Sequence, residues 1–320
     1  MKLALSGILL SSLIASAADV ALGDFGRSFM PASTVVIEWQ SPPTNLPLSI
    51  ATYRRVPTRF SPRVIQTCMD LGGWTMKQRT NVPGSPPNSN TNFLFFPNKD
   101  GIGRLGVDPD KGIIDYLDEK AHASASGNAK RVPTDKEAQD LARSFLKKLD
   151  IDESNLVHHA DGTLRMYGGR SIQGRRGVEE VITRSVYLTR QVDHIPFNGL
   201  GQNGGIWITL GDHAKISELR VVWPTLQLIE RRTTATRAEL EERIRQGKAI
   251  LVSSETSDVI LANLSSLTKL TVKQITPVYR GGNGFELDEV IQPFASLDVV
   301  AHFPRTNYQA MIDCSIFSVK

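Results

Sequence analysis

The sequence lacks the short motifs that identify many metal-dependent and nucleophilic enzymes. Its 320 residues include two cysteines, no CxxC pair and no HExxH segment. The ligand spacings of a zinc site are therefore missing. The GxSxG turn of serine hydrolases and the GxxxxGK[ST] loop of phosphate-binding proteins are missing as well. We expect no metal and no other cofactor.

A strong excess of charge of one sign is also missing. The net charge is +4 and the pI is about 9.0, and the basic residues occur as short, scattered pairs. A nucleic-acid-binding surface usually shows a basic stripe with interleaved aromatic residues, and the sequence has no such stripe. We expect no nucleic-acid partner.

Long apolar runs are missing except at the amino terminus. Lys2 precedes the apolar run 3–14, which is followed by Ala15, Ser16 and Ala17. A short apolar run before a small-x-small tripeptide is typical of a secretory signal peptide, and it is too short to span a bilayer. The sequence predicts a signal peptide at 1–17, no membrane insertion, and secretion to an extracellular or periplasmic compartment.

The two cysteines allow one disulfide in an oxidising compartment. A bridge between Cys68 and Cys314 would close a very long loop between an early helix and the last predicted strand. The alternative is that Cys68, on the apolar side of its predicted helix, is simply buried. Asn263, Leu264 and Ser265 fit the N-glycosylation pattern. This pattern matters only if the protein is secreted by a eukaryote.

The segment 183–223 shows the clearest strand pattern of the chain. Apolar and polar residues alternate through it, as in Ile206 and Ile208 against Trp207 and Thr209. Such alternation places one set of side chains on a core and the other set on the opposite face of a sheet. Asn-Gly and Gly-Asp pairs between the alternating runs favour tight turns. We predict three consecutive antiparallel strands here.

Three helices are predicted from their end signals. Residues 61–71 begin with a Ser-Pro pair and are followed by two glycines, which suits a helix start and a helix stop. The segments 134–149 and 236–246 both begin with a T-x-x-E capping box. Apolar residues in 134–149 recur at helical spacing and form one apolar stripe. Further strands are expected at 34–39, 93–97, 103–107, 112–118, 163–167, 269–280, 285–292, 297–303 and 310–319.

The order of these elements predicts an α+β fold in which helices pack on curved antiparallel sheets in two similar modules. In both halves a helix is followed by a series of strands joined by tight turns, which favours antiparallel pairing. The expected divisions are a signal peptide at 1–17, an N-terminal arm or linker at 18–50, a first module at 51–118, a linker at 119–133 and a second module at 134–320.

Several segments resemble one known family in order and spacing. They are TDKEAQDLARSFLKKLDID, VYLTRQVDHIPFNG, GGIWITLGDHAKISELRVVW, TRAELEERIRQGKAI and LTVKQITPVYRGG. Together these segments are similar to PepSY-like secreted proteins, which include regulators and peptidase propeptides with a cystatin-like helix on a curved sheet. The resemblance covers about residues 134–282, and His194 departs from it where the family usually has glycine. It implies two cystatin-like or PepSY-like modules and a non-catalytic role in binding a peptide or protein, with inhibition or regulation of a hydrolase.

The residues that could carry catalysis form no recognisable set. The candidates are Asp193, His194, His213, His158 and Glu179. Asp193-His194 and Asp212-His213 end neighbouring predicted strands, and we expect that they could face each other on one rim of the sheet. A general base needs a partner within hydrogen-bond reach. Turn residues and solvated side chains are the competing interpretation for all of them.

The residues that could carry binding are aromatic and basic. Tyr187 and Trp207 alternate out of phase with the apolar stripe, so we expect both on the face opposite the core, where exposed aromatic side chains commonly mark a contact surface. A second core that covers this face is the alternative. Arg170, Arg175 and Arg176 lie in a glycine-rich segment, 168–177, that we expect to be a loop able to hold an anion, a C-terminal carboxylate or an acidic surface. A mobile surface hairpin without a ligand is the alternative.

The sequence therefore favours a secreted, non-catalytic protein that binds a peptide or protein. An extracellular hydrolase with its site on the concave face of the sheet is one alternative. A structural component of the envelope or cell surface is another.

Overall fold

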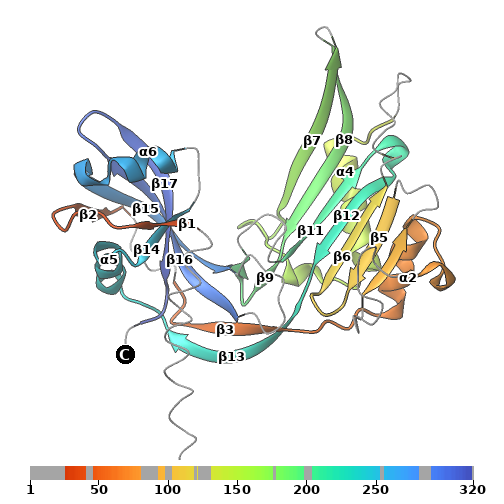
Figure 1. Cartoon of the computed structure of the whole chain (residues 1–320), viewed down its shortest axis with the longest axis horizontal. Coiled ribbons are helices and arrows are strands. Elements are labelled where there is room, and N and C mark those ends of the chain that lie inside the picture. The colour runs from red at the N-terminus through yellow and green to blue at the C-terminus, as the bar shows by residue number, and fades with distance from the viewer. Residues whose placement is uncertain are drawn as a thin grey trace, which may run out of the picture. The chain divides into compact units, whose positions relative to one another are not determined.

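The structure is a computed structural model of the chain, and it describes residues 26–40, 46–80, 93–97, 103–118, 121, 131–175, 178–197, 204–252, 256–280 and 290–318. The chain forms two compact units (Figure 1). Unit 1 combines 1–53 with 228–284 and 290–320, and unit 2 combines 54–227 with 285–289.

Unit 2 is built on a seven-stranded antiparallel sheet in the order β4-β5-β6-β12-β11-β8-β7. The strands are β4 (Leu94–Pro97), β5 (Gly103–Asp108), β6 (Ile113–Asp118), β7 (Met166–Arg175), β8 (Val178–Thr189), β11 (Gly205–Leu210) and β12 (Ile216–Val222). The pairing register aligns the apolar side chains of neighbouring strands, so that these side chains form buried rows across one face of the sheet. One such row runs through Phe96, Leu105, Tyr116, Leu219, Ile208 and Val186.

Two helices cover this apolar face: α2 (Pro62–Leu71) and α4 (Asp135–Lys148). The Ser61 hydroxyl caps α2 by accepting a hydrogen bond from the Val64 N–H (3.2 Å). The apolar stripe of α4, which includes Phe145 and Leu146, packs into the same core as the sheet. Both helices are confirmed where the end signals predict them. A separate pair of two-residue strands, β9 (Gln191–Val192) and β10 (Ile195–Pro196), follows β8.

Unit 1 contains most of an eight-stranded sheet in the order β1-β14-β17-β16-β15-β2, with β3 paired to β16 and β13 paired to β3. Its strands are β1 (Gly26–Phe29), β2 (Val36–Trp39), β3 (Ser49–Val56), β13 (Thr225–Thr233), β14 (Ala249–Val252), β15 (Lys269–Arg280), β16 (Val290–His302) and β17 (Asn307–Ser315). Its helices are α5 (Arg237–Arg245) and α6 (Ser257–Ala262). The predicted helix at 236–246 is confirmed with its Thr236–Glu239 capping box.

The predicted fold class is wrong. The described chain is mostly strand, with few helices. Strands from the two expected modules, 51–118 and 134–320, belong to a single sheet, because β6 pairs with β12. Strands after residue 248 form the other large sheet together with β1, β2, β3 and β13. Alternation identifies a strand, but the partner of a strand depends on long-range pairing, which local patterns do not report.

Two local expectations are also wrong. Residues 290–292 and 297–302, from two strands that were predicted separately, belong to one long strand, β16. The described part of 168–177 is the strand β7 instead of a loop, and at Gly168 no atom lies within 4 Å of the position that a side chain would occupy. The predicted signal peptide at 1–17 lies outside the described residues. Within the described ranges, no helix is both long and apolar enough to cross a membrane.

The predicted disulfide between Cys68 and Cys314 is wrong, and the alternative that Cys68 is simply buried is confirmed. Both cysteines are free and buried, Cys68 in the core of unit 2 and Cys314 on β17 in unit 1. Burial raises the pKa of each thiol to about 12, and the charge of Asp313 adds to the rise at Cys314. A thiol that is buried and protonated is a poor nucleophile.

We expect both thiols to be unreactive toward the reagent DTNB in the folded protein. After denaturation without reductant, two thiols per chain should react, one from each of the two cysteines. The measurement is the absorbance of the released thiolate before and after addition of guanidinium chloride. Denatured protein without reactive thiols would show that the chain is bridged.

Candidate functional site

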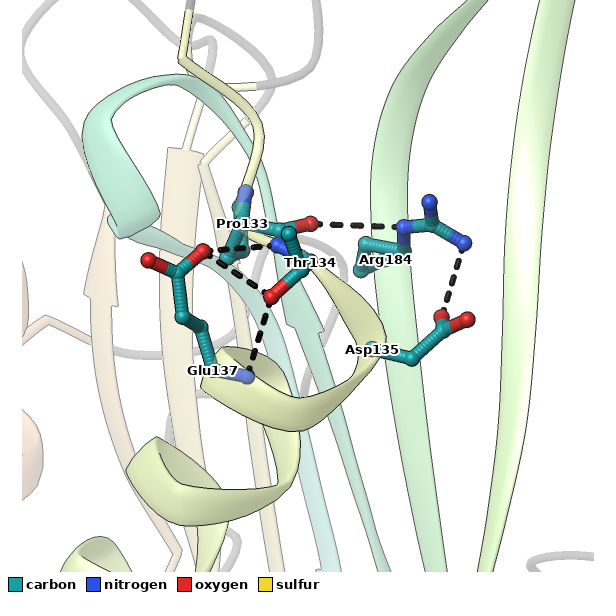
Figure 2. Close-up of polar contacts among 5 residues, drawn as sticks. All are labelled: Pro133, Thr134, Asp135, Glu137 and Arg184. Carbon is teal, nitrogen blue, oxygen red and sulfur yellow. Dashed lines mark hydrogen bonds and ion pairs between the residues drawn. The ribbon is translucent and has the colours of Figure 1, made fainter.

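The start of α4 is held by two sets of polar contacts, one within its first turn and one to the sheet of unit 2 (Figure 2). In the capping box, the N–H and hydroxyl of Thr134 donate to the Glu137 carboxylate (2.9 and 3.1 Å). These hydrogen bonds lower the pKa of Glu137. Arg184 of β8 donates to the Asp135 carboxylate (2.7 Å) and to the Pro133 carbonyl (3.3 Å). The first turn of α4 therefore has a defined position beside β8.

A groove of about 400 Å³ lies between this first turn and the strands β7 and β8. It is lined by Asp135, Ala138, Gln139, Gly168, Gly169, Arg170, Arg184, Ser185 and Val186. We call it the β7–α4 groove. Gly168 is directly across from Val186 in the register, and its missing side chain leaves space between strand and helix.

Two arginines and one carboxylate line the β7–α4 groove. Arg170 is directly across the β7–β8 pair from Arg184, and like charges in directly opposite positions are unfavourable. Arg184 is compensated by Asp135, whereas exposed Arg170 makes no hydrogen bond or ion pair within the described part of the chain. The groove therefore carries an excess of positive charge.

The outer side of β7 forms a long free edge of the sheet. β7 is ten residues long and pairs only with β8, and no other described strand lies on its outer side (Figure 1). Its residues from Tyr167 to Ile172 are exposed. Of the other edge strands in the described chain, β1, β2 and β4 are each four residues long, and β13, which pairs only with β3, is nine residues long. A bulge between Ser171 and Ile172 interrupts the pairing register with β8, so Met166–Ser171 is the longest regular part of the edge.

The aromatic residues lie in one row on the face opposite the helices. Tyr167, Tyr187 and Trp207 are cross-strand neighbours on β7, β8 and β11, with ring centroids 6.2 Å apart in both pairs. Arg165 stacks over Tyr167 at 4.9 Å. The predicted phase of Tyr187 and Trp207 is confirmed, since both point away from the helix-covered core.

The expected exposure of these aromatic residues is only partly met. Tyr187 is buried, at 6% exposure. Trp207 is half-buried, and its indole N–H donates to the Thr209 hydroxyl (2.8 Å). Tyr167 is the exposed member of the row, at 43%, and it was not among the predicted binding residues. Its position on an edge strand, which local alternation does not show, explains the difference.

The catalytic candidates are not brought together. Asp193 and His194 lie in the turn between β9 and β10, at the end of the sheet where β11 begins. His213 lies in the short turn at Asp212–Ala214, which follows the other end of β11. The six residues of β11 separate the two pairs, a length of about 20 Å at the usual rise per residue. The expectation that they face each other on one rim is wrong.

The other predicted residues have separate environments. His158 forms an isolated bridge with Leu164, and Asp161 in the turn between them accepts hydrogen bonds from Thr163, which lower its pKa. Glu179 belongs to β8, and its side chain lies outside the described residues, as does that of Arg175. Arg176 lies outside them altogether.

His213 lines a pocket of about 520 Å³ on the exposed side of α4, together with Glu137 and Asp140. The carboxylate of Glu137 serves the capping box and pairs with Arg131 (3.1 Å), and that of Asp140 pairs with Lys136 (2.7 Å). Both carboxylates are engaged, so this pocket offers no carboxylate that is poised as a base for a nucleophile.

One hydroxyl–imidazole–amide chain in unit 1 was missed by the sequence analysis. Thr271 Oγ1 lies 2.9 Å from His302 Nε2, and Asn307 Oδ1 lies 3.0 Å from His302 Nδ1. The order resembles a nucleophile, base and orienting group. Thr271 is buried in β15, at 5% exposure, so its hydroxyl is closed to a substrate. Within the described residues, no group of three or more His, Cys, Asp or Glu could hold a metal ion.

Comparisons with known proteins add a likeness to a solved structure. No protein-family model matches the chain, and no curated protein matches it. The chain is similar to an uncharacterized protein from Eubacterium rectale ATCC 33656, whose crystal structure was determined at 1.45 Å resolution. The two are 8% identical, the match covers 95% of this chain and 96% of the other, and the TM-score is 0.47. A likeness of this size assigns neither a family nor a function.

Proposed function

We propose that this chain is a secreted, non-catalytic binding protein that takes up an extended segment of a peptide or protein by strand addition at β7. The observation that carries the proposal is the long, exposed and unpaired outer edge of β7 in the described chain. An edge strand presents unpaired N–H and C=O groups, and an added strand can satisfy them.

An added strand at β7 would contact the protein through the side chains on both of its faces. Successive side chains of an added strand point to opposite sides. On one side they meet exposed Tyr167 and the aromatic row, and on the other they meet the β7–α4 groove. Main-chain hydrogen bonds would supply affinity and these two surfaces would supply selectivity. Regulation or inhibition of a hydrolase belongs to the same proposal, with a segment of the hydrolase as the added strand.

The test begins with selection of a phage-displayed library of random dodecapeptides on the immobilised protein. A recovered peptide is then resynthesised with single N-methyl groups along its backbone. We expect methylation at every second amide to weaken binding about tenfold or more, since each lost hydrogen bond to an ordered edge costs about 1–3 kcal/mol. The intervening amides point away from β7 and should tolerate the methyl group.

Hydrogen–deuterium exchange locates the added strand. Backbone amides in Met166–Arg170 should exchange more slowly when the selected peptide is bound, because an added strand accepts hydrogen bonds from those that point outward. The β4 edge at Leu94–Pro97 serves as the internal control and should be unchanged. Failure to enrich any peptide over an unrelated protein, protection elsewhere, or binding without a two-residue period in the N-methyl series would overturn the proposal.

A further inference from the structure

We infer that the β7–α4 groove binds a carboxylate, so that the strand added to β7 is acidic on its helix-facing side. The inference rests on the proposed function and names the chemistry of its ligand. It is carried by three features of the described residues. They are the groove of about 400 Å³ beside the free edge, the unpaired side chain of Arg170 in its lining, and the space left by Gly168.

The register places the arginines where a ligand side chain would arrive. Gly168 and Arg170 lie on the helix-facing side of β7, because they are directly across from Val186 and Arg184, whose side chains face α4. A residue added opposite Gly168 on the outer edge would point to the same side. Gly168 leaves its side chain room to enter the groove.

The charges of the groove favour an anion. Arg170 and Arg184 contribute two positive charges, and Asp135 supplies one negative charge, to Arg184. A carboxylate on the incoming strand would complete a second pair with Arg170 and relieve the repulsion between the two arginines. Guanidinium groups bind carboxylates with paired, charge-assisted hydrogen bonds, which select an acid over its amide.

The same charges disfavour a second copy of this chain as the added strand. Residues 162–172 contain Arg165 and Arg170 and no acidic residue. Two copies that paired through β7 would place these arginines along one joint edge, where like charges repel. An acidic segment of another molecule has the complementary charge.

The test uses the selected peptides and a double-mutant cycle. We expect the peptides recovered on the wild-type protein to carry Asp or Glu at positions two residues apart. The Glu that pairs with Arg170 is identified by replacing each Glu of such a peptide by Gln in turn. Its replacement should weaken binding about 10- to 100-fold, as expected for loss of a hydrogen bond to a charged group. On the Arg170→Gln protein, the Glu and Gln peptides should bind equally.

Arg165→Gln is the matched control. It removes the same charge from an exposed residue near β7, but Arg165 stacks on Tyr167 on the opposite face of the sheet. On this variant the preference for Glu over Gln should persist. Circular dichroism spectra of both variants should match that of the wild-type protein, because both side chains are exposed.

The two proposals fail in different ways. The carboxylate site would be overturned by enriched peptides without an acidic bias, or by a preference for Glu over Gln that persists on the Arg170→Gln protein. Strand addition would still stand in either case if N-methylation weakens binding with a two-residue period. A Glu preference that Arg170→Gln removes, without any periodic N-methyl effect, would support the groove and overturn strand addition. Absence of any enriched peptide would overturn both.

Discussion

Replacing Asp313 by alanine is expected to lower the free energy of unfolding of unit 1 by about 3–5 kcal/mol. Asp313 on β17 forms an ion pair with Arg280 on β15, and the two side chains are 0% and 7% exposed. Burial raises the pKa of Asp313, and contact with Arg280 and a hydrogen bond with Ser296 oppose that rise. Without Asp313, the Arg280 guanidinium remains buried without a counter-charge, and this destabilises the folded state.

The measurement is guanidinium chloride unfolding followed by circular dichroism, with hydrogen exchange of β15–β17 to assign the change to unit 1. Asp298→Ala on β16 is the matched control, because it removes an exposed carboxylate from the same sheet, and it should change stability by less than about 0.5 kcal/mol. The double variant Arg280→Met/Asp313→Leu should recover most of the loss. Equal stabilities of Asp313→Ala and Asp298→Ala would contradict the prediction.

Local signals in the sequence were sufficient to predict α2, α4 and α5, whereas the short α6 (Ser257–Ala262), which has no side-chain cap, was not predicted. The cap of a helix lies within three or four residues of its start, so Ser61, Thr134 and Thr236 could be identified from neighbouring residues alone. The alternation around Tyr187 and Trp207 likewise predicted which side chains face the core. Both kinds of signal depend on short-range geometry.

The partners of the strands could not be predicted in the same way. β6 and β12 are about a hundred residues apart in the chain, and their pairing merges what looked like two modules into one sheet. The same limit applies to the candidate site. Arg184 and Asp135 are 49 residues apart, and Arg170 meets them only because β7 pairs with β8 as an edge strand. The glycines of 168–177 suggested a loop, although a strand tolerates a glycine where no atom packs on the missing side chain, as at Gly168.

The single sheet of unit 2 leads to the second large prediction, which concerns Phe96. This residue is fully buried on β4 and packs near Trp74, with ring centroids 6.4 Å apart. We expect Phe96→Ala to lower the free energy of unfolding of unit 2 by about 3–5 kcal/mol, because it removes a large apolar side chain and leaves a cavity. Ile172→Ala, which shortens an exposed side chain on β7, should cost less than about 0.5 kcal/mol.

The distribution of the loss distinguishes the observed fold from two separate modules. β4 and β8 belong to one sheet and share one core with α4, so the unit should lose stability as a whole. Amide exchange should therefore accelerate in β8 and α4 of the Phe96→Ala protein by nearly the same factor as in β5 and β6. Faster exchange confined to residues before 119, with β8 and α4 unchanged, would show instead that the first module is stable by itself and that the β6–β12 pairing contributes little.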